Sequence, residues 1–332
     1  MIRAGGSLAN EALRGLAWRD TIGDMGQGDQ VWHGLVDGRN AVARALLLGS
    51  YTDLAPDEET LTWELLSAAV WRSSVITARR FTRHEESNYT GADWIWWWEG
   101  PPGEWFGCLV QAKRLTAHRD GPRFDYSYTP TRDGAMPQVD QLIAAADHLD
   151  IPAAYVLYWA PNVGSPGPWA CGAIAPDFDA AAVTFIAAGV VHEWLAMGYQ
   201  PNLRLLHPLE CLACDQRCDA GSGAMSWYSH TLGDARLRSI LLARPDTAAK
   251  SAFRALFSSM AMLRNAQMSA PANLDTADTT HSGFPLTEHF VRGFRGAPHY
   301  VEAILAGESP DLGGLEEHAA GVVVVRSPGQ LR

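Results

Sequence analysis

The amino-acid sequence predicts an α/β fold whose best-defined part is a core over residues 55–165. Three observations carry this prediction: an apolar repeat at helical spacing, two aromatic runs about a Gly/Pro turn, and a near-continuous apolar run typical of a buried strand. They give the order helix, hairpin, helix, strand. We therefore expect an N-terminal extension (1–54), this core, and a mainly helical C-terminal elaboration packed on it (166–332).

The core begins with a predicted amphipathic helix. From Thr60 to about Arg80, apolar residues recur every three or four positions, which gives one apolar face. Three acidic residues, 57–59, lie at its start, where the helix dipole favours negative charge. The pattern therefore predicts one helix up to about Arg80.

An antiparallel hairpin is predicted next. The run DWIWWWE begins at Asp93, the run EWFGCLVQAKR ends at Arg114, and the sequence GPPG forms the turn between them. Residues two apart on a strand point to the same face, so Gln111 and Lys113 should share one face of the hairpin. A short helix in QVDQLIAAADHL and a buried strand in IPAAYVLYWA complete the core.

The net charge limits the partners that we expect. The 332-residue chain has a formal net charge of −11, which argues against tight non-specific binding of nucleic acid by the isolated protein, because Lys and Arg drive phosphate binding. The acidity lies mostly outside residues 71–133, which carry nine basic and eight acidic side chains. No apolar run has the length of a signal peptide or a membrane span, so we expect a cytoplasmic protein with reduced cysteines and no membrane partner.

Three hairpin residues make a candidate site for phosphodiester hydrolysis. This reaction needs divalent cations held by oxygen ligands, an activated water, and positive charge near the phosphate. The carboxylate of Asp93 and the amide carbonyl of Gln111 are hard oxygen donors suited to Mg²⁺ or Mn²⁺, and Lys113 is placed to act on the water. The chain has 24 Arg but only two Lys, so a lysine at position 113 indicates that a compact, titratable ammonium is needed there.

The segments GADW (91–94) and VQAKR (110–114) resemble the restriction-endonuclease-like (PD-(D/E)XK) nuclease superfamily, in particular its Mrr-type branch, where glutamine replaces the usual acid. The resemblance covers the stretch from Thr60 to about Ala160 and implies an αβββαβ core, with a mixed central sheet flanked by helices. It also implies a Mg²⁺-dependent endonuclease with DNA favoured over RNA, a role in bacterial defence against foreign DNA, and a second copy or a defence-system subunit as partner.

The same resemblance implies further site residues. It places an acid on the first helix, where Glu64 occupies the corresponding position, while Glu86 competes because it is nearer in sequence to Asp93. Both acids stay open as metal ligands. Gln138 and Gln141, one turn apart on the following helix, are similar to polar residues that support such sites. The alternative function is a nuclease-fold binding or scaffold protein without cleavage, which the acidic net charge and the glutamine at position 111 favour.

A second candidate site contains cysteines. Cys211 and Cys214 have the Cys-x₂-Cys spacing of structural zinc sites, Cys218 follows, and either His207 or Cys171 would be the fourth ligand. Ordinary buried thiols are the alternative. The sequence therefore predicts Mg²⁺ or Mn²⁺ at the hairpin and leaves a structural Zn²⁺ open.

Overall fold

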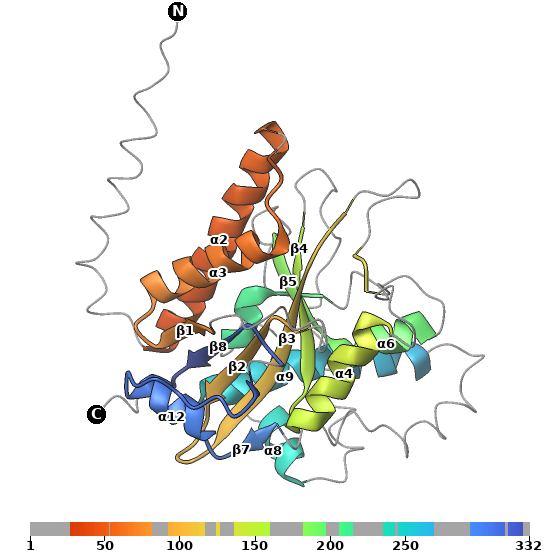
Figure 1. Cartoon of the computed structure of the whole chain (residues 1–332). Helices are drawn as coiled ribbons and strands as arrows, with labels where there is room; N and C mark the ends of the chain where they lie inside the picture. Colours follow the sequence, from red (N-terminus) through yellow and green to blue (C-terminus); the bar gives the residue numbers. More distant parts are fainter. Residues whose placement is uncertain are drawn as a thin grey trace, which may run out of the picture.

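One mixed β-sheet organises the chain (Figure 1). The computed structural model describes residues 27–52, 54–81, 92–116, 124–126, 136–159, 182–196, 206–214, 235–242, 245–268, 293–315 and 318–327. Its eight strands follow the order β1-β8-β2-β3-β4-β5-β6, and β7 pairs with β3 off this path. The described strands are β1 (Ile76–Arg80), β2 (Trp94–Glu99), β3 (Trp105–Arg114), β4 (Ala153–Tyr158), β5 (Val183–Ala187), β6 (His207–Pro208), β7 (Phe294–Arg295) and β8 (Gly321–Val325).

Helices flank the sheet on both faces, which confirms the α/β class predicted from the sequence. They are α2 (Gln27–Thr52), α3 (Glu58–Arg72), α4 (Gln138–Leu149), α6 (Ala188–Ala196), the 3₁₀ helix η4 (Leu209–Ala213), α8 (Ala235–Leu242), α9 (Ala248–Met268) and α12 (His299–Leu305). In Figure 1, α4 lies in front of the sheet and α9 behind it. Within the described parts of the chain, no helix combines the length and apolar composition needed to cross a bilayer.

The predicted hairpin is present as β2 and β3. The two strands pair antiparallel from Trp94↔Val110 to Glu99↔Trp105, and β3 then pairs parallel with β4. A parallel pair needs a crossover connection, and α4 lies in the segment that joins β3 to β4. This arrangement brings the C-terminal end of β3, which carries Gln111 and Lys113, beside β4.

The helix predicted to reach Arg80 is shorter than expected. Helix α3 ends at Arg72, Ser73 is an extended C-cap whose N–H donates to the carbonyl of Ala69, and β1 begins at Ile76. Apolar residues that continue the helical period thus belong to a strand. The reason is tertiary, because β1 pairs antiparallel with the valine-rich strand β8, for example Ile76↔Val325. At the other end, the Asp57 carboxylate caps α3 by accepting from Thr60 N at 2.7 Å.

The C-terminal region (166–332) was expected to pack on the predicted core, but it also supplies strands to the same sheet. It contributes β5, β6, β7 and β8 to the same sheet, and β8 lies between β1 and β2. All five residues of β8 are buried, which fits an inner strand covered on both faces. The expected boundary at residue 165 therefore does not divide the sheet.

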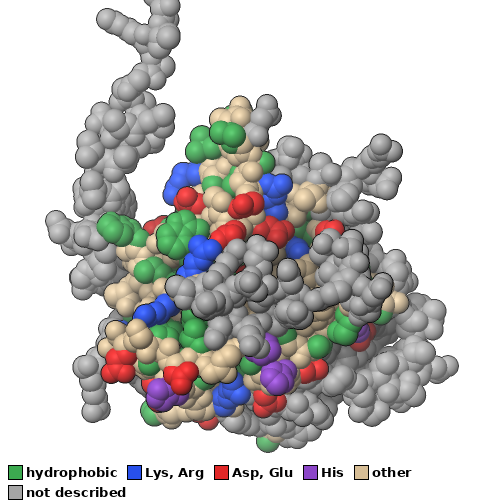
Figure 2. Space-filling model, viewed as in Figure 1, with side chains coloured by type: hydrophobic (Ala, Val, Ile, Leu, Met, Phe, Trp, Pro, Cys, Tyr) green, Lys and Arg blue, Asp and Glu red, His purple; other side chains and the backbone are tan. Residues whose placement is uncertain are grey.

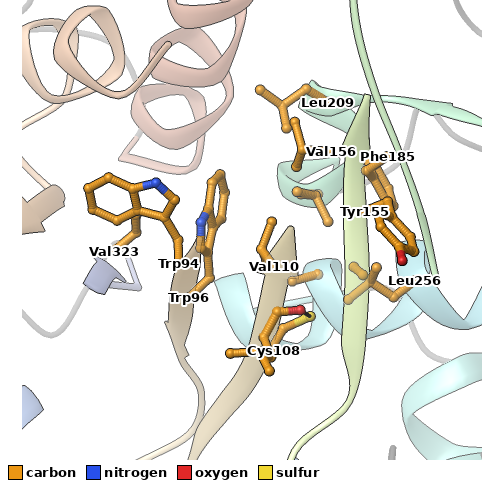
Figure 3. Packing of buried hydrophobic residues seen from close by; sticks show 14 of the residues in the cluster. Trp94, Trp96, Cys108, Val110, Tyr155, Val156, Phe185, Leu209, Leu256 and Val323 are labelled. Carbon is orange, nitrogen blue, oxygen red and sulfur yellow. Dashed lines mark hydrogen bonds between the residues drawn. The ribbon is translucent and has the colours of Figure 1, made fainter. Parts of the chain in front are cut away.

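The core lies between the sheet and its helices. Figure 3 shows Trp94 and Trp96 of β2 and Val110 of β3 in one cluster with Leu256 of α9. The ring of Phe106 meets that of Phe253 of α9 edge-on, with centroids 5.7 Å apart. Because side chains alternate along a strand, the even-numbered residues of β3 face α9 and the odd-numbered residues face the opposite side.

Exposed apolar side chains concentrate on the helical hairpin α2–α3. Of the eight large hydrophobic residues that are exposed in the described parts, seven lie between residues 47 and 71. Figure 2 shows hydrophobic side chains at the tip and along one side of this hairpin, and it shows basic and acidic side chains interspersed on the same face of the molecule. Apolar patches of this kind commonly mark interaction surfaces.

Candidate active site

Asp93 is the residue just before β2, and its backbone and side chain both bind neighbouring strands. Its N–H donates to the carbonyl of Val110 at 2.9 Å, and its carbonyl accepts from the N–H of Ala320 at 2.9 Å. Its carboxylate Oδ2 accepts from the N–H of Ala112 at 2.7 Å. The half-buried carboxylate is thus held beside the residue that separates Gln111 from Lys113.

Gln111 and Lys113 are both buried, with exposed fractions of 3% and 8%. They are odd-numbered residues of the unbroken strand β3, so they share the face that points away from α9. The Oε1 atom of Gln111 has no hydrogen-bond partner among the described residues. No described residue forms an ion pair with Lys113. Burial of an amide oxygen and an ammonium without such partners costs stability, and this combination is typical of functional sites.

Two tyrosines lie beside this group, Tyr155 of β4 and Tyr126. Tyr155 is the strand partner of Gln111, and its ring meets that of Tyr126 at 5.0 Å between centroids. Burial raises the pKa of Tyr155 far above its ordinary value, and the negative charges of Asp140 and Asp93 raise it further. Asp140 belongs to α4 and also lies 3.3 Å from Nε2 of His192. Tyr155 is therefore a neutral phenol at neutral pH.

The acid that α3 brings to β3 is Glu58, which the sequence analysis did not select. Its carboxylate Oε1 accepts from the N–H of Arg114 at 2.8 Å. The Arg114 guanidinium donates to the carbonyl of Pro56 at 2.5 Å, which fixes the same corner. Glu64 lies on the exposed side of α3, because the buried positions of the helix fall on the side of Glu58. The signal that could have found Glu58 is the spacing of the buried residues Thr62, Leu65 and Ala69 along the same helix face.

The structure describes two of the three remaining residues that the sequence predicted for the site. Glu86 lies outside the described residues. Gln138 is the first residue of α4, and its Oε1 is buried without a described hydrogen-bond partner. Gln141 donates from Nε2 to the carbonyl of Met136 at 2.6 Å, so its amide stabilises the start of α4.

The donor set fits a hard divalent cation that keeps water ligands. One carboxylate, on Asp93, is held beside Gln111, whose amide oxygen is buried and unsatisfied. Glu58 supplies a second carboxylate at the end of the same strand. Within the described parts, no group of three His, Cys, Asp or Glu side chains converges as a metal site. Mg²⁺ commonly binds through one or two carboxylates and retains several waters, so oxygen donors of this kind are compatible with it.

The cysteine candidate is only partly described. Cys211 is buried in η4 and Cys214 follows it half-buried, while Cys218 and Cys171 lie outside the described residues. The Nε2 atom of His207 lies 2.7 Å from Oγ of Ser258, and its ring stacks on Phe185. The zinc site thus stays a prediction from the sequence.

The chain has a recognisable family. Residues 28–330 match the model of a family of unknown function, DUF6615, and the chain belongs to that family. No curated protein matches the sequence.

Proposed function

We propose that this DUF6615 protein is a metal-dependent endonuclease with a restriction-endonuclease-like core, and that it hydrolyses phosphodiester bonds of DNA. The observation that carries the proposal is the hydrogen bond from Ala112 N to Asp93 Oδ2, which holds the acid of the GADW segment beside the Gln-x-Lys pair of the next strand. The order α3-β1-β2-β3-α4-β4 supports it, because this is the αβββαβ order that the resemblance implies.

The residues have separate roles in this proposal. Asp93, Gln111 and Glu58 would hold Mg²⁺ or Mn²⁺ through oxygen atoms, and Glu58 takes the position for which the sequence offered Glu64 or Glu86. The bound cation supplies Lewis-acid activation of water and neutralises phosphate charge. Lys113 holds positive charge beside the phosphate and orients the attacking water. The backbone N–H of Ala112 fixes the Asp93 carboxylate in place.

DNA is the proposed substrate, bound in the cytoplasm in the course of defence against foreign DNA. The net charge of −11 opposes non-specific binding, and basic and acidic side chains are interspersed on the face seen in Figure 2. Bound cations would offset the acidic residues of the site. We therefore expect cleavage to depend on specific docking and on salt concentration.

A second function is a nuclease-fold binding protein that does not cleave. One observation favours it, namely the exposed apolar surface of the α2–α3 hairpin, where Trp71 is 70% and Tyr51 79% exposed. Such a surface suits a protein partner, either a second copy of the chain or a subunit of a defence complex. Metal-dependent cleavage by the isolated protein distinguishes the two functions.

The test is nicking of supercoiled plasmid DNA with Mg²⁺ or Mn²⁺ and with excess chelator. The decisive variant is Asp93→Asn, whose amide oxygen still accepts from Ala112 N but carries no charge for a cation. Asp311→Asn is the matched control, because the Asp311 carboxylate also accepts from a backbone N–H, that of Gly313 at 3.1 Å, on the exposed surface. We expect chelator and Asp93→Asn to abolish nicking and Asp311→Asn to preserve it. Chelator-resistant nicking, or full activity of folded Asp93→Asn, would refute the metal site.

A further inference from the structure

A closed set of hydrogen bonds joins the first turn of α3 to the ends of β3 and β4. The hydroxyl oxygens of Tyr158 and Thr62 lie 2.8 Å apart, and the Thr62 hydroxyl donates to the carbonyl of Glu58 at 2.8 Å. The Glu58 carboxylate in turn accepts from Arg114 N at 2.8 Å. Arg114 is the β3 residue that pairs with Tyr158 of β4, so the set closes on itself.

The direction of these bonds follows from the protons available. A threonine hydroxyl has one proton, and that of Thr62 goes to the Glu58 carbonyl, so Tyr158 must donate to Thr62. Tyr158 is fully buried and Thr62 is 7% exposed, so water does not compete for the bond. Burial raises the pKa of Tyr158, and the negative charges of Asp93 and Glu58 raise it further. The donor proton is therefore retained at neutral pH.

We propose that Tyr158 is a positioning residue for the candidate site: through Thr62 it fixes the first turn of α3 and holds the Glu58 carboxylate at the end of β3, next to Lys113. This inference rests on the proposed function for the role of Glu58 as a metal ligand. Thr62 lies one helical turn after Glu58, so a shift of its hydroxyl moves the backbone that carries the Glu58 side chain.

A purely structural role for Tyr158 makes a different prediction. Removing a buried tyrosine hydroxyl that is hydrogen-bonded lowers stability wherever the tyrosine lies. Tyr300 provides the matched control, because its hydroxyl accepts from Nε1 of Trp97 at the same distance, 2.8 Å, in α12. Tyr158→Phe and Tyr300→Phe remove the same group and one side-chain hydrogen bond each. Only Tyr158→Phe should change the Mn²⁺ affinity to which Glu58 contributes.

The experiment measures Mn²⁺ affinity by electron paramagnetic resonance of the free ion, with the full chain and without DNA. Thermal melts identify variants that do not fold. We expect Tyr158→Phe and Thr62→Val to weaken Mn²⁺ binding about 10-fold, as changes behind a metal ligand commonly do. Tyr300→Phe should bind Mn²⁺ as the wild type does. In a Glu58→Gln background, Tyr158→Phe should weaken binding by less than about twofold further, because both changes then act through one ligand.

Two results would overturn the positioning role. One is wild-type Mn²⁺ affinity in folded Tyr158→Phe and Thr62→Val, and the other is an equal loss with and without Glu58→Gln. Plasmid nicking on the same samples separates this inference from the proposed function. Mn²⁺ binding that depends on Asp93 and Tyr158 without any nicking would support the positioning role and refute the nuclease. A wild type that binds no Mn²⁺ would overturn both.

Discussion

Replacing Lys113 with methionine should remove nicking activity while leaving the fold intact. The side chain is 8% exposed, so it contributes to packing as well as to charge. Methionine keeps an unbranched stem of similar length and removes only the ammonium. Alanine also removes three buried methylene groups, which lowers stability by about 2.4 kcal/mol at about 0.8 kcal/mol each. Relief of a buried charge that no described residue pairs with offsets part of this loss.

The expected magnitudes separate catalysis from stability. A group that acts on the attacking water contributes about 10²–10⁴-fold to the rate, which corresponds to about 2.7–5.4 kcal/mol of barrier. Lys113→Met should therefore lose at least about 100-fold in nicking rate with a nearly unchanged melting temperature. Lys113→Ala should lose as much activity and also melt a few degrees lower, at about 2 °C per kcal/mol for a large domain.

The assay pairs plasmid nicking with thermal melting, and the other lysine of the chain is the control. Lys250 lies 2.7 Å from Oδ1 of Asp246 in an i,i+4 pair of the type worth about 0.3–0.5 kcal/mol, in α9 and outside the candidate site. Lys250→Met should nick as the wild type does. A folded Lys113→Met protein with the wild-type nicking rate would show that the buried ammonium has no part in the reaction.

Three further changes test other parts of the site. Gln111→Glu adds a third carboxylate, beside those of Asp93 and Glu58, at a position that is 3% exposed. It should therefore destabilise the metal-free protein and tighten Mn²⁺ binding, and a melting temperature that does not respond to Mn²⁺ would contradict this. Glu58→Gln should raise the Mg²⁺ concentration needed for half-maximal nicking more than Glu64→Gln does, because Glu58 bonds to Arg114 N and Glu64 is exposed; equal effects would remove the distinction. Hydrogen bonds from Thr60 hold the pKa of Asp57 below its ordinary value, so its capping stability is full above about pH 4 and is lost as the pH falls below that value. Asp57→Ala should thus lower the melting temperature at pH 7 but bring little change at pH 2–3, and an equal drop at both would argue against the ionised cap.

Local patterns in the sequence predicted the hairpin and the face that it presents. Strand parity alone placed Gln111 and Lys113 on one side of β3, because an unbroken strand keeps the period of two that the argument needs. The Gly/Pro turn and the aromatic runs gave the β2–β3 pairing, whose partners are adjacent in the sequence. Features that depend on residues close together in the sequence could therefore be predicted.

Features that depend on residues far apart in the sequence could not be predicted in this way. Strand β1 was expected to be the end of a helix, because its apolar residues fit the helical period and its partner β8 is more than 200 residues away. Glu58 was missed for the same reason. Glu58 and Glu64 are both acids of α3, and only the contacts of this helix with Tyr158 and Arg114 show that Glu58 is the one that points to β3. The place of β8 inside the sheet has no local signature beyond the valine run itself.

The position of β8 between β1 and β2 determines when, during synthesis, β2 obtains its partner on that side. Strand β2 is complete at Glu99, yet its neighbour begins at Gly321, so at about 5–20 residues per second the ribosome needs about 10–45 s to supply it. Throughout this interval one edge of β2 lacks its partner, and the Asp93 carbonyl lacks the N–H of Ala320. A chain released early would carry the three signature residues without the strand that braces them. The proposed cutting activity would thus be confined to chains that include β8.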